Sequence, residues 1–272
     1  MLNLFKADIY RILRGKALYI TLAVLVLIIV LMVAASFQMH MGFTPPEYVY
    51  DEYGVAQPHE LTQVSAASGV NIPYALADSM ENFVFFLLPI IVIVAGAIFT
   101  HGTVKNDLAW GISRTKLYFS KLLLTFAIGT MMLLFYVGLS IVLVTINNGF
   151  GGPAPAGHWV GLIQIYLAQL VLLFALMSIG VFLAFVTKRT AAVNGAFIGF
   201  CMVPPFIIML LTLSNEWFLR LFDFDMLSNI MALSSLPQLA TGEILRALGV
   251  GVFWLILSTV SGIALFRRAE IK

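Results

Sequence analysis

NFVFFLLPIIVIVAGAIFT, residues 82–100, is followed directly by HGTVKNDLAWGISRTKLYFSK, residues 101–121, which carries four cations and one anion. A second apolar run begins at residue 121 and continues to residue 146. A helix crosses the hydrocarbon core of a bilayer with about 20 apolar residues. The stretch is therefore predicted to form two membrane spans joined by a short, charged insert.

Composition extends this prediction to the whole chain. Of the 272 residues, 61% are hydrophobic and 10% are charged, whereas soluble domains have roughly 25% charged residues. The single cysteine, Cys201, lies in an apolar run, so the sequence offers neither a disulfide framework nor a Cys/His zinc site. We predict an all-α integral membrane protein in which residues 1–272 form one transmembrane domain.

Apolar runs of about 20 residues predict six membrane spans. They cover residues 17–37, 82–100, 121–146, 160–186, 191–213 and 246–266. Of the 15 Lys and Arg residues, 13 lie in the two terminal segments, between spans two and three or between spans four and five. The other three connections hold ten of the 13 acids. The positive-inside rule then places both termini in the cytoplasm. The basic balance indicates membrane topology and not a nucleic-acid partner.

The N-terminal segment, LNLFKADIYRILR at residues 2–14, has the pattern of an amphipathic helix. Its apolar residues share one helical face, and its charged residues Lys6, Asp8, Arg11 and Arg14 lie elsewhere. This pattern predicts an interfacial helix on the inner leaflet before span one. The alternative is a plain basic tail that only sets the topology.

Two outer connections are long enough to have structure of their own. The outer loop at residues 38–81 is acidic and contains several Pro and Gly residues, and it could serve as a cap or gate. Residues 214–245 mix aromatic and charged side chains at helical spacing. Such a segment is too polar to span and too apolar to stay in water, so we expect amphipathic or re-entrant helices between spans five and six.

Features inside the spans predict irregular packing. Pro89 and the pair Pro204–Pro205 are expected to kink spans two and five. Two spans carry small residues four positions apart, a spacing that favours close contact between helices. These pairs are Gly195 with Gly199 and Ser258 with Gly262.

Motifs for chemistry are missing from the sequence. It has no GxxxxGK[ST] phosphate loop, no HExxH, no GxSxG and no Cys/His metal cluster. We therefore expect no enzymatic activity in the chain itself.

The polar candidates for a transport path are Gln164, Gln169 and Asn194. The two glutamines lie about 140° apart on a helix, so the alternative for them is hydrogen bonding between helices.

The insert itself suits a rigid contact with a partner protein. Residues from Asp107 to Arg114 could form a short helix, Leu108 and Trp110 offer apolar anchors, and Gly102 and Gly111 permit sharp turns. The alternative is a solvated loop whose cations only follow the positive-inside rule.

A resemblance favours the partner contact. The insert has the pattern G-T-x-K-x-x-L-x-x-x-x-S-R-x-x-x-x-x-x-K, formed by Gly102, Thr103, Lys105, Leu108, Ser113, Arg114 and Lys121. This pattern resembles the loop between spans two and three in membrane subunits of type-2 ABC exporters, and the layout of the whole chain agrees. The sequence departs from many relatives at His101, where they carry an acid.

The resemblance implies a permease subunit in the cytoplasmic membrane of a bacterial cell. Two copies, or this chain with a similar one, would form the transmembrane path and bind two separate cytoplasmic ABC ATPase subunits. ATP and Mg would be held by the ATPase, with no cofactor on this chain. The cargo would be an amphipathic peptide, drug or lipid-like molecule, as in bacteriocin-immunity exporters. The loop at 101–120 would be the ATPase-coupling helix, with Gly102, Thr103, Lys105, Asp107, Leu108, Trp110, Gly111, Ser113 and Arg114 at the contact.

Three other functions compete with this one. An ATP-independent secondary carrier or channel would normally hold an ionisable group near mid-membrane, and none of the 13 acids lies there. A membrane enzyme would need a site such as Asp223 and Asp225 with His158, although such acids beside Arg220 more often form a solvated face. A non-transporting anchor would use the same loop but would show no coupling between substrate and ATPase activity.

Overall fold

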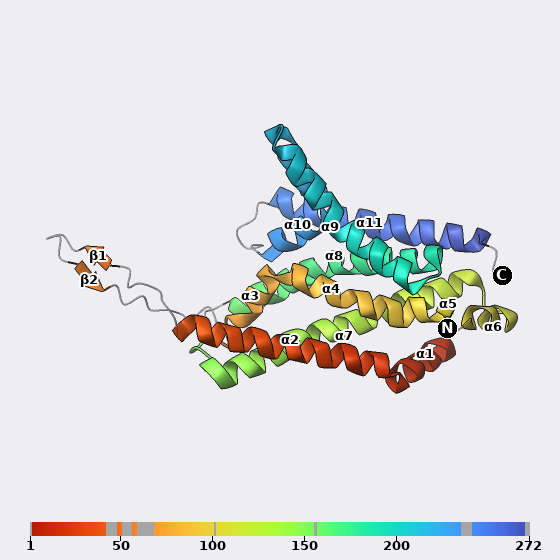
Figure 1. Cartoon of the computed structure of the whole chain (residues 1–272), viewed down its shortest axis with the longest axis horizontal. Helices are drawn as coiled ribbons and strands as arrows, with labels where there is room; N and C mark the ends of the chain where they lie inside the picture. Colours follow the sequence, from red (N-terminus) through yellow and green to blue (C-terminus); the bar gives the residue numbers. More distant parts are fainter. Residues whose placement is uncertain are drawn as a thin grey trace.

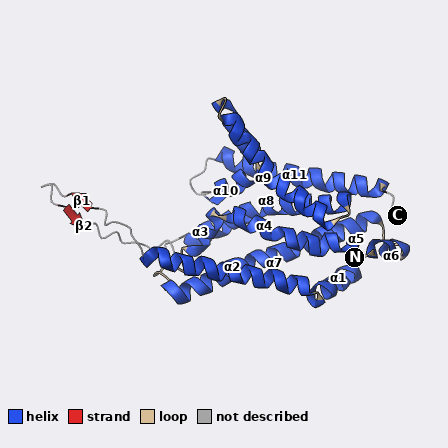
Figure 2. Ribbon diagram, in the orientation of Figure 1, coloured by secondary structure: helices blue, strands red, loops and turns tan. Residues whose placement is uncertain are grey.

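The computed structural model describes residues 2–41, 48–50, 56–58, 68–100, 102–154, 157–234 and 241–269. Almost all of these residues are helical (Figure 2). Six helical segments are long and apolar enough to cross a membrane, which confirms the six predicted spans. They are Lys16–Ala34, Met80–Thr100, Arg114–Asn148, His158–Thr187, Thr190–Thr212 and Thr241–Arg268.

Short elements connect these spans at both ends of the bundle. The first half of the chain contains α1 (Leu2–Arg14), α2 (Lys16–Met41), β1 (Tyr48–Tyr50), β2 (Ala56–Pro58), α3 (Ile72–Asp78), α4 (Met80–Ile91), the π-helix η1 (Val92–Gly96), α5 (Ala97–Thr100) and α6 (Thr103–Ala109). The second half contains α7 (Arg114–Asn148), α8 (His158–Thr187), α9 (Thr190–Thr212), the 3₁₀ helix η2 (Glu216–Phe224), α10 (Met226–Ala232) and α11 (Thr241–Arg268). The strands β1 and β2 pair antiparallel.

Helix α8 is the centre of the bundle. It packs against α4, α7, α9 and α11, and its contact with α11 is the most extensive. In its most apolar stretch 61% of the residues are buried, against 17% in α2 and in α9. Helices α2 and α9 therefore lie at the periphery, where their exposed apolar side chains suit contact with lipid.

The second span is interrupted as Pro89 predicts. Proline has no N–H to donate and disturbs the preceding turn, and the π-helix η1 begins three residues after Pro89. Single π turns of this kind bend a helix. Gly96 ends η1, and a Cβ there would lie 3.2 Å from Thr190 Cγ2 at the start of α9. The irregular turn thus lies close to the fifth span.

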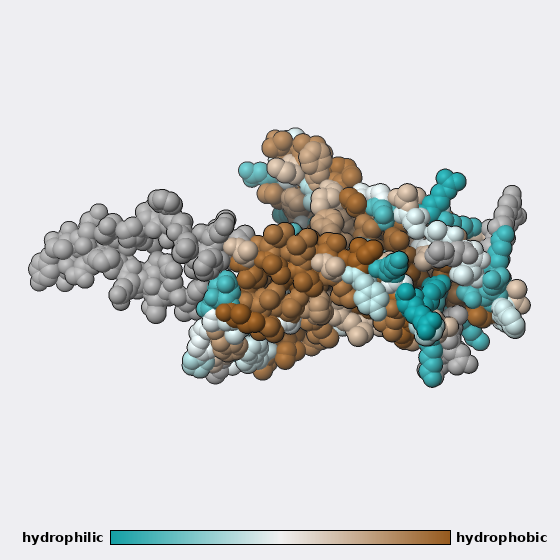
Figure 3. All heavy atoms as spheres, turned by 60° about the horizontal axis from the view of Figure 1, so that its bottom comes forward, coloured by the Kyte–Doolittle hydropathy of each residue, from teal (hydrophilic) through white to brown (hydrophobic). Residues whose placement is uncertain are grey.

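Both chain ends and α6 lie at the same end of the bundle (Figure 1). Hydrophilic residues gather at this end, and the middle of the molecule is covered by apolar residues (Figure 3). The excess of Lys and Arg in the connections here makes it the cytoplasmic end. An even number of spans also returns the C-terminus to the side of the membrane on which the N-terminus lies.

Short helices at the opposite, outer end match the expectation for residues 214–245. Within the described residues, η2 and α10 are the helices of this connection. The outer loop at 38–81 contributes α3, which is joined to α8 by two hydrogen bonds from a tyrosine side chain to a backbone carbonyl, one in each direction. Tyr166 Oη donates to the carbonyl of Pro73 at 2.8 Å, and Tyr74 Oη donates to that of His158 at 2.7 Å. Residues 42–47, 51–55 and 59–67 of this loop lie outside the described residues.

The two pairs of small residues have different surroundings. Gly262 of α11 lies against the ring of Tyr118, and Ser258 Oγ contacts Ser178 Oγ of α8. Gly195 and Gly199 of α9, in contrast, have no neighbouring heavy atom within 4 Å of where a Cβ would lie. The outer half of α9 also leans away from the bundle (Figure 1). The α11 pair therefore packs within the chain, and the α9 pair faces outward.

Candidate functional site

Residues 102–113 of the loop at 101–120 form the short helix α6 and a tight turn that leads into α7, and His101 lies outside the described residues. Gly102 has φ of 65° and precedes α6, and Gly111 has φ of 78° just after it. The N–H of Gly111 donates to the carbonyl of Leu108 at 3.0 Å, and that of Ile112 donates to Asp107 at 3.2 Å. This bonding is the Schellman motif, which needs a left-handed residue where Gly111 stands.

The position of the short helix corrects the sequence prediction. The helix was expected from Asp107 to Arg114, but α6 runs from Thr103 to Ala109. The left-handed glycine ends α6, and Ser113 then starts α7 by accepting a hydrogen bond from the N–H of Lys116 at 3.4 Å. The predicted turns at Gly102 and Gly111 are confirmed by their positive φ angles.

Arg114 fastens the loop to the last helix of the chain. Its Nη1 atom lies 3.0, 2.8 and 2.7 Å from the carbonyl oxygens of Phe266, Arg267 and Ala269. These carbonyls belong to the C-terminus of α11, where no further turn can satisfy them and where a cation is favoured by the helix dipole. Arg114 therefore has bonding partners within the chain, and the ATPase contact that the resemblance implies for it stays a prediction.

The change Arg114→Ala tests this cap. A hydrogen bond to a charged group contributes about 1.5–3 kcal/mol, so we expect a loss of this order in stability, together with faster amide exchange in the last turn of α11. Thermal denaturation and hydrogen exchange of the purified protein would measure both effects. Arg268→Ala, which removes an exposed arginine from the same helix, should leave both nearly unchanged. Equal stability and equal amide exchange in the two variants would contradict the role of Arg114 as a cap of α11.

A buried ion pair joins α7, directly after the loop, to the first helix. Lys121 is fully buried in α7, and its Nζ lies 2.6 Å from Asp8 Oδ2 of α1. Arg11 Nη2 lies 3.2 Å from the other oxygen of Asp8. The sequence had placed Asp8 away from the packed face of α1 and had counted Lys121 as a loop cation. Asp8 instead lies on the packed side of α1. The packing of α1 on α7 buries both side chains, and their pairing offsets the cost of removing the two charges from water.

Asp107 belongs to α6 and is close enough to this ion pair to be influenced by its charges. Partial burial raises the pKa of the Asp107 carboxyl above its ordinary value, and the positive charge of Lys121 opposes that rise. Asp107 thus faces the interior of the loop, together with Leu108, which packs against the core. Leu108 was predicted as an anchor for a partner, but much of its side chain serves the chain's own packing.

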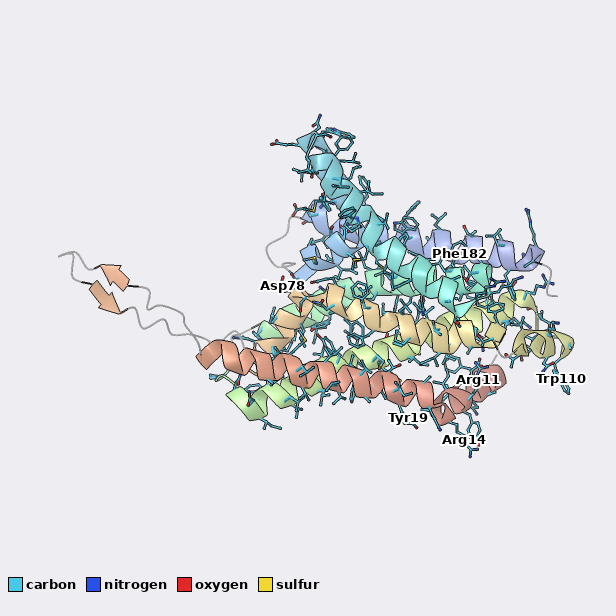
Figure 4. All side chains as sticks on the ribbon, in the orientation of Figure 1. Arg11, Arg14, Tyr19, Asp78, Trp110 and Phe182 are labelled. Carbon is cyan, nitrogen blue, oxygen red and sulfur yellow. The ribbon has the colours of Figure 1, made fainter. Side chains whose placement is uncertain are left out.

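The surface that the loop presents to the cytoplasm is dominated by Trp110. Its side chain is 86% exposed and lies at the tip of the loop, pointing away from the bundle (Figure 4). Lys105 of α6 is also exposed, while Thr103 is partly buried and donates to the carbonyl of Ile98 at 3.4 Å. An exposed indole on a rigid support has the features of an interface anchor without its partner.

The three polar candidates for a transport path do not meet in one place. Gln164 is exposed on α8, and Gln169 is fully buried, where its Nε2 donates to the carbonyls of Ala77 at 2.7 Å and Ile230 at 2.9 Å. Gln169 therefore joins α8 to α3 and α10, as the alternative predicted. Asn194 is partly buried near the start of α9, and its amide oxygen is buried without a hydrogen-bond partner.

The residues considered for an enzyme site, Asp223, Asp225 and His158, each contact a different partner and do not form one site. Asp223 pairs with Arg246 at 3.1 Å, and Asp225 accepts a hydrogen bond from the N–H of Ser228 at the start of α10. His158 Nε2 lies 2.9 Å from the carbonyl of Val70. Among the described residues no group of three His, Cys, Asp or Glu side chains could hold a metal ion.

Comparison with known proteins agrees with the layout of spans and loop. The model of the family described as "ABC-2 family transporter protein" matches residues 2–271. The chain belongs to the ABC-2 transporter family. A search of curated proteins gave no match. As an ABC-2 family member the chain is a multi-pass permease subunit, a transport component and not a catalytic domain, and the family implies a cytoplasmic ABC ATPase as its partner.

Proposed function

We propose that the chain forms the transmembrane path of an ATP-driven exporter and that the loop at 101–120 is the coupling helix on which the ATPase acts. In this proposal the ATPase holds ATP and Mg²⁺, and its closure pushes on α6. The observation that carries the proposal is the fixed support of an exposed Trp110, because a loop that transmits force must move together with the spans.

The two attachments of the loop determine where a push on it would go. The ion pair between Lys121 and Asp8 leads to α1, and the contact of Arg114 with the carbonyls at the end of α11 leads to the sixth span. Between them lies α7, which continues directly from the loop. Displacement of α6 would therefore reach α1 and the third and sixth spans together, which fits a rigid-body motion of packed helices.

The variant Trp110→Ala tests the coupling role. Truncation of an interface anchor commonly costs 2 kcal/mol or more, so we expect the affinity of the ATPase for the permease to fall at least tenfold. Insertion into the membrane should be intact, because no span is changed. Co-purification in mild detergent, with quantification of the ATPase and its hydrolysis rate, is the measurement.

Trp217 provides a matched control at the other end of the molecule. It is 57% exposed in η2, in the outer connection, so Trp217→Ala removes the same side chain far from the proposed ATPase. We expect unchanged recovery of the ATPase with this variant. Full recovery and full transport with Trp110→Ala would reject the coupling role.

Assembly with a second permease copy, identical or similar, is part of the proposal. Support comes from α9, whose Gly195 and Gly199 have open space beside them, since small residues at this spacing favour close helix contact in membranes. The proposed complex contains two permease copies and two ATPase copies in a bacterial cytoplasmic membrane.

For cargo we propose an amphipathic molecule such as an antimicrobial peptide, a lipophilic drug or a lipid. The apolar walls of the spans and the absence of acids from mid-span, as read in the sequence, favour such a cargo over an ion. Stimulation of ATPase activity by candidate peptides and drugs is the assay. An ATPase that responds to none of them would favour the non-transporting anchor.

A further inference from the structure

We infer that a pocket beside the α1–α2 turn binds an anionic phospholipid of the inner leaflet. The pocket has a volume of about 290 Å³ and lies between the first two helices, the interrupted second span and the start of α9. It is separate from the loop that carries Trp110, and the inference does not depend on the coupling role.

The pocket is apolar in depth and polar at its mouth. Leu18, Val92 and Ile93 form part of the apolar wall, and Arg11, Thr100 and Thr190 add polar groups. Thr100 ends the second span and Thr190 begins the fifth, so both mark the cytoplasmic end. Val92 lies eight residues before Thr100, about 12 Å deeper along a helix. This shape suits an acyl chain with its headgroup at the membrane surface.

Positive charge surrounds the mouth. Arg11 lines the pocket, and its Nη2 atom is buried without a hydrogen-bond partner, its contact with Asp8 being an ion pair at 3.2 Å. Asp8 is already bonded to Lys121, so one carboxylate serves two cations. Other cations of the two adjoining turns are Arg14, Lys16, Lys188 and Arg189. Basic pockets between spans on the cytoplasmic side favour anionic headgroups.

Two further features fit a lipid at this position. Helix α9 begins at Thr190 without a side-chain cap, so its first N–H groups add to the attraction for a phosphate. Tyr10 and Tyr19 are 58% and 57% exposed close to the α1–α2 turn, and Figure 4 shows Tyr19 near Arg11 and Arg14. Exposed tyrosines are typical of the level of lipid headgroups.

The test is native mass spectrometry of the full chain in detergent, titrated with phosphatidylglycerol and with phosphatidylcholine of the same acyl chains. We expect phosphatidylglycerol to bind at least fivefold more tightly. One basic residue near an anionic headgroup contributes roughly 1 kcal/mol, or about fivefold, so Arg11→Gln should lose most of this preference. Ala97→Phe, which fills the pocket but keeps every cation, should weaken both lipids.

Lys116→Gln is the matched control, because it removes an exposed cation at the same end of the molecule, outside the pocket. It should keep the wild-type preference, and Arg11→Lys should restore it. Equal binding of the two lipids to the wild type would overturn the inference. So would an equal loss in Lys116→Gln and Arg11→Gln, or lipid binding unaffected by Ala97→Phe.

Discussion

Replacing Lys121 by alanine is expected to destabilise the folded protein by about 3–5 kcal/mol, because it leaves the carboxylate of Asp8 buried without its closest partner. Asp8 is 6% exposed and Lys121 is fully buried, so water cannot replace the lost ammonium group without opening the packing of α1 on α7. The measurement is the apparent Tm of the purified protein in detergent, together with the protease sensitivity of α1. We expect a lower apparent Tm and faster proteolysis of α1.

Two further variants separate charge pairing from general damage. Lys116→Ala removes an exposed lysine from the same helix and should stay within about 0.5 kcal/mol of the wild type. The double variant Asp8→Leu with Lys121→Met replaces both charges by apolar groups and should recover much of the stability. A double variant as unstable as Lys121→Ala would show that the pair does not act through its charges.

Replacing Gly262 by alanine has the second large expected effect. A Cβ at this position would overlap with Tyr118 Oη and would lie 2.6 Å from Cζ. The ring cannot move aside easily, since it is fully buried and packs on Phe185 with 4.9 Å between centroids. Overpacking of this kind costs about 1–3 kcal/mol. We expect α11 to be displaced from α7, with a lower apparent Tm.

Gly249 offers the matched comparison on the same helix. No neighbouring heavy atom lies within 4 Å of where its Cβ would be, and alanine is the better helix former by roughly 1 kcal/mol. Gly249→Ala should therefore leave the Tm unchanged or raise it. A Tm for Gly262→Ala as high as that for Gly249→Ala would contradict the tight contact with Tyr118.

The fold could be predicted from the sequence because the bilayer sets the length of each span and charge bias sets its direction. These rules use only local composition, and all six predicted spans appear in the structure. The interruption after Pro89 also follows from a local rule, since proline lacks the N–H of the helical ladder. What local rules do not supply is the order in which the spans pack around α8.

The sequence predicted the location of the candidate site and its two glycine turns, but not the bounds of α6 or the partners of its charged residues. The turns at Gly102 and Gly111 could be read from glycine alone, yet the left-handed conformation of Gly111 shifts α6 toward Thr103. The partners of Arg114 and Lys121 are 152 and 113 positions away in the sequence. No pattern within one segment reports such contacts, so the sequence alone offered Arg114 no partner within the chain and counted Lys121 only among the cytoplasmic cations.

The contact between Arg114 and the end of α11 has a consequence for biosynthesis. The two sides of the contact are separated by 152 to 155 positions, which a ribosome adds in roughly 8–30 s at 5–20 residues per second. During that time Arg114 has been synthesised and its carbonyl partners in α11 have not. A permease truncated before α11 would carry Trp110 on an incomplete base, so the support of Trp110 is complete only after α11 has been synthesised.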